Sequence, residues 1–247
     1  MNYQLLTVNQ TKMAKSTAEG YLSAVLHLEP AYQIGDLNTC PNAGICKGTC
    51  IAKTGRMRFD SAQLARIRRT ELLAHDPYYF MRVLDAEIHQ HTGQARKLGL
   101  KPTVRLNGTS DIRWQEYKQL RQTIFDLHPT TQFLDYTKLP EQVNLGIPNY
   151  TVVFSASEKA TEQEISTILD NYGRVAQVFN VKRNEPLPNL QKINGKLYRV
   201  VDGDTHDLLH LRPLGVILGL RYKVAFSSKT RKALKPNKRF VILPEVI

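Results

Sequence analysis

The chain has 247 residues, a formal net charge of +12 and only three cysteines. A chain of this length can bury a core without disulfides, and its longest apolar run, Leu214 to Leu220, is too short to cross a bilayer. These properties exclude a disulfide-stapled secreted module and a membrane-spanning protein, and they predict a cytoplasmic protein with no membrane partner.

Taken in chain order, the pattern predicts a polar N-terminal extension over residues 1–20, one domain over residues 21–226 and a basic C-terminal tail over residues 227–247. The first strand is expected at 21–28 and is followed by a loop at 39–50 that holds every cysteine. A helix is expected over 60–75. Asp76 and Pro77 then read as the N-cap and first turn of a second helix.

The second helix carries an apolar stripe with steps of three and four residues. Its members are Phe80, Leu84, Ile88, His91, Ala95 and Leu98. Because His91 lies on this stripe, we interpret it as a core residue rather than a ligand.

After residue 100, predicted strands alternate with predicted helices. The strands are expected at 103–107, 132–136, 150–155, 174–179, 198–201 and 216–220. One helix is indicated by Tyr117, Leu120, Ile124 and Leu127. Another opens with the capping box Thr161-x-x-Glu164 and buries Ile165, Ile168, Leu169 and Tyr172. This order predicts an α/β fold, a full or partial parallel (β/α) barrel, with an open doubly wound sheet as the alternative.

The cysteines Cys40, Cys46 and Cys50 have the spacing C-x5-C-x3-C. A disulfide would leave one thiol over and close only a short loop, whereas one metal centre explains all three. Zinc needs a fourth ligand, and the fold would have to supply His27 or His75. Three thiolates without a histidine favour a [4Fe-4S] cluster, with zinc and unmetallated thiols as alternatives.

Polar residues gather where the predicted strands end, which is where barrel enzymes carry their chemistry. They are Asn107, Ser110, Asp111, Asp135, Ser155, Ser157, Asp202 and Asp204. We expect Asn107, Asp111, Asp135 and Asp202 to point into one cavity beside the cysteine loop. Caps and turns are the alternative interpretation, and Asp202, Asp204 and Asp207 would also suit a divalent-metal hydrolase.

Positive charge is concentrated in two islands. Residues 47–69 hold seven basic residues against Asp60, and residues 220–247 hold eight against Glu245. If the islands meet, they form a phosphate-attracting surface, although such charge can also serve solubility alone. The candidate nucleic-acid contacts are Arg66, Arg68, Arg69, Lys232, Lys235 and Lys238. The absence of a base-reading motif argues against a sequence-specific regulator.

Five segments in this order resemble the "gene product 88" family of phage and plasmid proteins, over about residues 21–226. They are the cysteine loop C-P-N-A-G-I-C-K-G-T-C and the segments V-R-L-N-G-T-S-D-I, D-Y-T-K, N-Y-T-V-V-F-S-A-S-E and D-G-D-T-H-D-L. The strand ends and cysteine triad are in turn similar to radical S-adenosylmethionine enzymes, which are partial barrels.

The resemblance implies that Cys40, Cys46 and Cys50 ligate a [4Fe-4S] cluster whose open iron binds S-adenosylmethionine. It implies catalytic roles for Asp111 and Asp135, and it places the other strand-end residues around cofactor or substrate. The substrate would be a nucleic acid, a nucleotide or a modified base in the host cytoplasm, and the partner an electron donor. The competing hypothesis is a non-catalytic nucleic-acid-binding protein in which zinc or a cluster is a structural clip.

Overall fold

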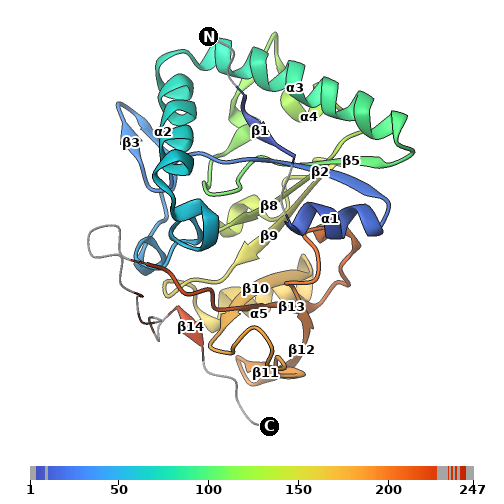
Figure 1. The fold of residues 1–247 in the computed structure, drawn as a ribbon. Helices are drawn as coiled ribbons and strands as arrows, with labels where there is room; N and C mark the ends of the chain where they lie inside the picture. Colours follow the sequence, from blue (N-terminus) through green and yellow to red (C-terminus); the bar gives the residue numbers. More distant parts are fainter. Residues whose placement is uncertain are drawn as a thin grey trace.

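The computed structural model describes residues 4–8, 11–226, 233, 235, 237 and 240–242, and it is built on one large sheet (Figure 1). In spatial order the strands of this sheet are β1 (Leu6–Thr7), β2 (Tyr21–Leu26), β5 (Lys101–Arg105), β8 (Gln132–Thr137), β9 (Tyr150–Ser155), β10 (Arg174–Phe179), β13 (Val216–Arg221), β12 (Lys196–Asp202) and β11 (Leu190–Ile193), with β14 (Val241–Ile242) beside β10. Two hairpins stand apart from it, β3 (Gln33–Ile34) with β4 (Leu37–Asn38) and β6 (Lys118–Gln119) with β7 (Gln122–Thr123).

The strands from β2 to β12 are parallel, while β1 and β11 are antiparallel strands at the two edges. The predicted α/β fold with a mostly parallel sheet is therefore confirmed. A full barrel is not formed, because no strand pairing in the described ranges joins the β1 edge to the β11 edge. From β2 to β10 the spatial order follows the chain order, without the reversal that defines a doubly wound sheet.

The helices are α1 (Thr11–Ala18), α2 (Asp60–His75), α3 (Pro77–Lys97), α4 (Ile124–Leu127) and α5 (Glu162–Asn171), and the 3₁₀ turns are η1 (Ile45–Lys47), η2 (Ile51–Lys53), η3 (Gly55–Arg58), η4 (Trp114–Glu116), η5 (Pro140–Gln142) and η6 (Leu209–Leu211). Helices α2 and α3 begin where the sequence predicts. The carboxylate of Asp76 accepts a hydrogen bond from the Tyr79 backbone N–H at 2.9 Å, and the Thr161 capping box is present. No helix among the described residues has the length and apolarity to cross a membrane.

Alternate residues of the central strands pack into different clusters. Phe133 packs in a cluster with residues of α3, and Phe154 packs in a cluster with residues of α5. Their chain neighbours Leu134 and Val153 belong to a third cluster, which also holds Leu209 of η6. Since successive strand residues point to opposite faces, the sheet is buried on both sides, as parallel sheets generally are.

The helix predicted around Leu120 is wrong. Residues 114–127 form η4, the β6–β7 hairpin and the single turn α4. At the hairpin turn Leu120 and Arg121 have φ angles of 47° and 72°, and the Leu120 side chain is 98% exposed. The apolar spacing in this stretch arises from separate local elements. Leu98 and Tyr172, the last members of the other two stripes, are also exposed because they lie at helix ends.

The first residues described belong to the domain. Leu5 and Leu6 are buried in the core, and their backbone N–H groups donate to the Glu87 carboxylate of α3 at 2.8 and 2.7 Å. These bonds add to the pairing of β1 with β2 and attach the segment to both the sheet and α3.

Two of the parallel ladders in the middle of the sheet are short. The β5–β8 ladder consists of two residue pairs, and the β9–β10 ladder ends where Ser155 pairs with Ala176, so β10 continues past the end of β9. Beyond it, β14 pairs with Val178 and Phe179 of β10. A cavity can therefore open at this end of the sheet, with the C-terminal segment forming part of its wall.

Candidate functional site

A cavity of about 1110 Å³ lies at the carboxyl ends of the strands, between the cysteine loop and the segment that follows β13. Cys40, Cys46 and Cys50 all line it. This is where the topology predicts an active site, since βα loops of successive parallel strands meet at the carboxyl edge.

The cysteine loop is a series of tight turns. The carbonyl oxygens of Cys40, Cys46 and Cys50 each accept a hydrogen bond from the N–H three residues further on, at 3.0, 3.2 and 2.9 Å. The Cys40 thiol lies 3.7 Å from the Thr109 carbonyl oxygen, which connects this loop to the loop after β5. All three thiols are free and half-buried.

The three thiols line one cavity without converging on a single point. Among the described residues, no three His, Cys, Asp or Glu side chains are close enough together to hold one metal ion. Burial raises the pKa of the Cys40 thiol to about 11 and also raises the pKa of Cys50. A metal would therefore have to displace protons from these sulfurs on binding. The thiols suit a thiolate-ligated centre in type and in common placement, and the turns of the loop would have to tighten around it.

Glu158, in the loop after β9, holds the cysteine loop in place. Its Oε1 accepts a hydrogen bond from the Ile45 backbone N–H at 2.8 Å, while its Oε2 is buried without a hydrogen-bond partner among the described residues. A Cβ atom on Gly44 would collide with Glu158 Oε1, so a larger residue would displace this carboxylate from the Ile45 N–H. The φ of −109° at Gly44 shows that a left-handed conformation is not the reason for glycine here.

Asn107 and Asp135 form a buried network that shapes the loop after β5. The Asp135 carboxylate accepts hydrogen bonds from the Asn107 backbone N–H at 2.7 Å and the Tyr150 hydroxyl at 3.0 Å. Asn107 Oδ1 accepts from the Ser110 hydroxyl and the Trp114 indole. Burial raises the pKa of Asp135 to about 7. Asn107 and Ser110 line the cavity, whereas Asp135 lies outside its lining.

Asp111 lines the cavity and joins three loops. Its backbone N–H donates to the Thr39 carbonyl at 2.7 Å, and its carboxylate accepts from the Thr137 hydroxyl at 2.7 Å and the Lys138 backbone N–H at 2.8 Å. Both carboxylate oxygens are thus engaged in holding the end of β8. Burial raises the pKa of Asp111.

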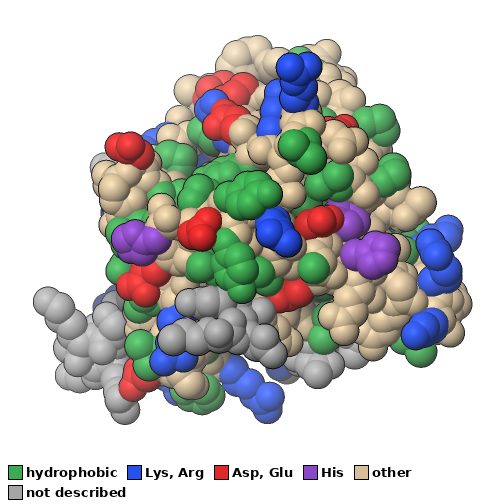
Figure 2. Space-filling model, turned by 90° about the horizontal axis from the view of Figure 1, so that it is seen from above, with side chains coloured by type: hydrophobic (Ala, Val, Ile, Leu, Met, Phe, Trp, Pro, Cys, Tyr) green, Lys and Arg blue, Asp and Glu red, His purple; other side chains and the backbone are tan. Residues whose placement is uncertain are grey.

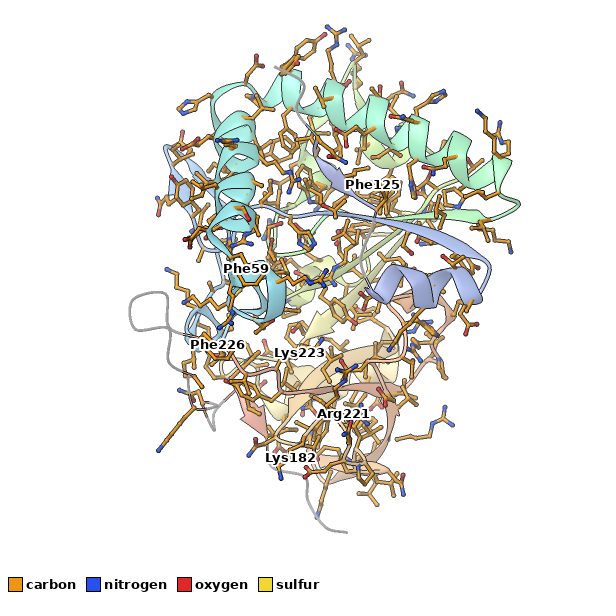
Figure 3. The ribbon with its side chains drawn as sticks, viewed as in Figure 1. Phe59, Phe125, Lys182, Arg221, Lys223 and Phe226 are labelled. Carbon is orange, nitrogen blue, oxygen red and sulfur yellow. The ribbon has the colours of Figure 1, made fainter. Side chains whose placement is uncertain are left out.

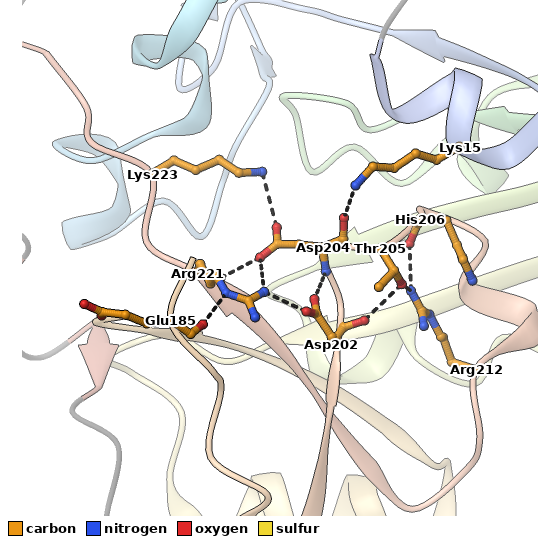
Figure 4. Close-up of polar contacts among 9 residues, drawn as sticks. All are labelled: Lys15, Glu185, Asp202, Asp204, Thr205, His206, Arg212, Arg221 and Lys223. Carbon is orange, nitrogen blue, oxygen red and sulfur yellow. Dashed lines mark hydrogen bonds and ion pairs between the residues drawn. The ribbon is translucent and has the colours of Figure 1, made fainter. Parts of the chain in front are cut away.

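Asp202 and Asp204 are joined to Arg221 by ion pairs (Figure 4). Asp202 Oδ2 lies 2.8 Å from Arg221 Nη1, and Asp204 accepts from the Arg221 backbone N–H and lies 3.5 Å from Lys223 Nζ. Neither carboxylate lines the cavity, although Arg221 and Lys223 do. The expectation of one shared cavity thus holds for Asn107 and Asp111 and is wrong for Asp135 and Asp202. This engagement also gives a divalent-metal hydrolase no support.

The two serines after β9 lie in different places. Ser155 lines the cavity, and its hydroxyl oxygen is 3.4 Å from Lys138 Nζ. Ser157 lies outside the cavity lining, and its hydroxyl accepts from the Lys159 backbone N–H at 3.3 Å.

The predicted nucleic-acid contacts differ widely in environment. Arg66 is 4% exposed and its Nε lies 2.8 Å from Glu29 Oε2. Arg69 is half-buried and donates to the carbonyl oxygens of Gln4 and His27, whereas Arg68 and Lys235 are exposed. Lys232 and Lys238 fall outside the described residues.

The two basic islands meet at the cavity. The Phe226 backbone N–H donates to the Lys53 carbonyl at 3.1 Å, and the Arg58 guanidinium lies 4.3 Å from the Phe226 ring centroid. In Figure 3, Phe59 and Phe226 lie on the left of the molecule, and Lys223 and Arg221 lie nearer its middle. Eight basic and three acidic residues are found among the described residues that line the cavity; the basic ones are Lys47, Lys53, Arg58, Arg66, Arg105, Lys138, Arg221 and Lys223.

This concentration of charge is local. The face seen from above in Figure 2 mixes hydrophobic, acidic and basic side chains. Sequence reasoning did not single out Arg58 or Arg105 as cavity residues. It did indicate Lys138, because this residue follows a predicted strand in the segment D-Y-T-K.

Fold and site together define an open, mostly parallel α/β protein with a cationic, cysteine-lined cavity at the carboxyl edge of its sheet. The family model for "Gene product 88" matches residues 4–236, and the chain belongs to this family of phage-type gene products. No curated protein and no solved structure matches the chain. None of these comparisons supports the similarity to radical S-adenosylmethionine enzymes.

Proposed function

We propose that the protein is an iron-sulfur enzyme whose cysteines hold a [4Fe-4S] cluster at the wall of the cavity and whose substrate is a nucleic acid, a nucleotide or a modified base. The observation that carries the proposal is the presence of three thiols on one cationic cavity at the carboxyl ends of parallel strands. When bound, such a cluster supplies one-electron chemistry and an open iron site for S-adenosylmethionine.

The chain's own residues bind and orient in this proposal. Glu158 and Asp111 fix the cysteine loop against the loops after β9 and β5, so the three thiols stay on one wall. The basic residues of the lining attract an anionic substrate and hold its phosphates. An electron donor would act as the protein's partner.

Anaerobic reconstitution with iron and sulfide, and separately with zinc, tests the metal. We expect about four irons and four sulfides per chain, and loss of loading in C40S, C46S and C50S. Thr49→Val is the matched control, because it alters a side chain of the same loop without removing a thiol. Wild-type protein that stays folded and loads neither iron nor zinc would refute a metal centre.

Calorimetric titration of S-adenosylmethionine into the reduced, reconstituted protein tests the enzyme. We expect binding that C46S lacks. Absence of binding to a cluster-loaded wild type would remove the radical-type reaction and leave the second candidate standing.

The second candidate is a non-catalytic nucleic-acid-binding protein with a structural zinc or iron-sulfur clip, favoured by the meeting of the two basic islands. It is distinguished by chelation: a structural clip predicts that removing the metal lowers the melting temperature and the nucleic-acid affinity together.

A further inference from the structure

Half of the eight basic residues that line the cavity are paired with carboxylates of the protein. Arg66 pairs with Glu29, and Arg221 pairs with Asp202. Lys223 lies beside Asp204, and Arg105 lies beside Asp207. An arginine or lysine held by a carboxylate is a poor phosphate ligand, because binding a second anion requires the first to be displaced or shared.

Arg58 and Lys138 differ from these residues. No ion pair joins either one to a carboxylate within the part of the chain that the structure describes. The Lys138 ammonium has only long contacts with the Ser155 carbonyl and hydroxyl oxygens, at 3.3 and 3.4 Å. An ammonium has three N–H donors, so the Lys138 ammonium can also donate hydrogen bonds to an anionic ligand.

Each of these cations lies over an aromatic ring. Arg58 is 4.3 Å from the centroid of Phe226, and Lys138 Nζ is 4.9 Å from the centroid of Phe240. Both members of each pair line the cavity. The cavity wall therefore presents charge and ring together at two places contributed by distant parts of the sequence.

The position of Lys138 is fixed from behind. The Asp111 carboxylate accepts a hydrogen bond from the Lys138 backbone N–H. The backbone of Lys138 is therefore held, and its side chain lies on the cavity side of the loop. Asp111 is thereby a positioning residue for this cation.

We propose that the wall formed by Arg58 and Phe226, with Lys138 and Phe240, binds single-stranded nucleic acid, with phosphates on the cations and bases against the rings. Alternating basic and aromatic side chains are the usual means of binding single strands, whose unstacked bases can contact rings. The bases of a duplex are stacked on one another and cannot contact these rings. At about 1110 Å³ the cavity exceeds the usual range for one small ligand, which favours a strand over a mononucleotide. Single-stranded nucleic acid would then be the substrate of the proposed enzyme, and to this extent the inference rests on the proposed function.

Fluorescence anisotropy with a labelled oligothymidylate of about twelve nucleotides, a matched duplex and unlabelled ATP as competitor tests this binding. We expect tighter binding of the single strand than of the duplex and little competition by ATP. R58Q and K138Q should each weaken binding by about tenfold and lower the salt slope by about 0.7. Phe226→Leu should cost about tenfold through lost stacking, and Lys138→Arg should restore most of the affinity.

Lys196→Gln is the matched control. Lys196 lies over the ring of Tyr198 at 5.2 Å, so it has the same local contact, but it pairs with Asp170 and lies away from the cavity. Wild-type affinity and salt slope are expected for this variant. An equal loss in K196Q, unchanged binding in both R58Q and K138Q, equal affinity for duplex, or displacement by equimolar ATP would overturn the proposal.

Metal content measured on the same preparations separates this inference from the proposed function. Normal cluster loading with binding unaffected by R58Q and K138Q refutes the binding wall alone. Failure of wild-type loading with variant-sensitive single-strand binding refutes the iron-sulfur enzyme alone.

Discussion

Arg66 provides the sharpest test of how charge is used in this protein. It lies in the first basic island, yet it is 4% exposed, its Nε lies 2.8 Å from Glu29 Oε2, and its Nη1 donates to the Met57 carbonyl at 2.8 Å. Replacing it with methionine keeps most of the volume and leaves Glu29 Oε2 and the Met57 carbonyl without the Arg66 donors, while Glu29 Oε1 keeps its hydrogen bond from Gln63 Nε2 at 3.1 Å. Breaking a buried pair in this way costs about 3–5 kcal/mol.

Urea denaturation of R66M, R68M and the double variant R66M/E29L measures the effect. R66M should lose about 3–5 kcal/mol, while R68M, at an exposed position, should stay within about 0.5 kcal/mol of wild type. R66M/E29L should recover most of the loss, because it removes the stranded carboxylate. Equal stability of R66M and R68M would refute the reasoning and return Arg66 to the set of free phosphate contacts.

Three further outcomes are expected. Gly44→Ala should lose about 1 kcal/mol and part of its metal loading, because the new Cβ would displace the Glu158 carboxylate from the Ile45 N–H. Gly48→Ala should lose neither, since a Cβ there would meet only the Ile45 carbonyl at 3.5 Å, and equal melting temperatures of the two variants would contradict this. Burial raises the pKa of Asp135 to about 7, so the folded state retains a proton that the unfolded chain releases. The free energy of unfolding should therefore fall as pH rises from about 4 to about 7. D135N should lack this fall, and parallel pH profiles of stability for D135N and wild type would count against the explanation. Replacing Leu120 and Arg121 with Asn and Gly should stabilise the β6–β7 turn by about 1 kcal/mol and raise the melting temperature, since both residues have positive φ.

Local signals in the sequence located elements well. The N-cap at Asp76 and the capping box at Thr161 identify helix starts because their hydrogen bonds span only three residues. The parallel sheet was also predicted, because strand and helix patterns alternate in much of the sequence. The structure departs from strict alternation, since only the 3₁₀ turns η5 and η6 lie between β8 and β9 and between β12 and β13. Whether the sheet closes into a barrel could not be predicted, because closure depends on which strands the last strands of the chain pair with. The helix around Leu120 was wrong because apolar spacing does not reveal two consecutive positive φ angles.

The candidate site was predictable in outline only. Strand ends correctly indicated Asn107, Ser110, Asp111 and Ser155 as cavity residues. Residue type could not reveal that the Asp111 oxygens are engaged by Thr137 and Lys138, or that Asp202 pairs with Arg221. Charge runs likewise cannot separate a buried arginine from a free one. The pairing of Arg58 with Phe226 joins residues far apart in the chain, which no local pattern records.

The contribution of Phe240 and β14 bears on how the protein acquires any metal. The cysteine loop is synthesised well before Phe240, which forms part of the cavity wall. The neighbouring residue Ile242 is fixed late as well, since its carbonyl accepts a hydrogen bond from the Asn180 N–H at 2.8 Å. A nascent chain on the ribosome therefore carries its thiols beside an incomplete pocket. Metal delivered during translation would reach the thiols across an open surface, whereas metal delivered after release would have to enter the completed cavity. An affinity tag placed directly after Ile242 would therefore disturb delivery after release more than delivery during translation.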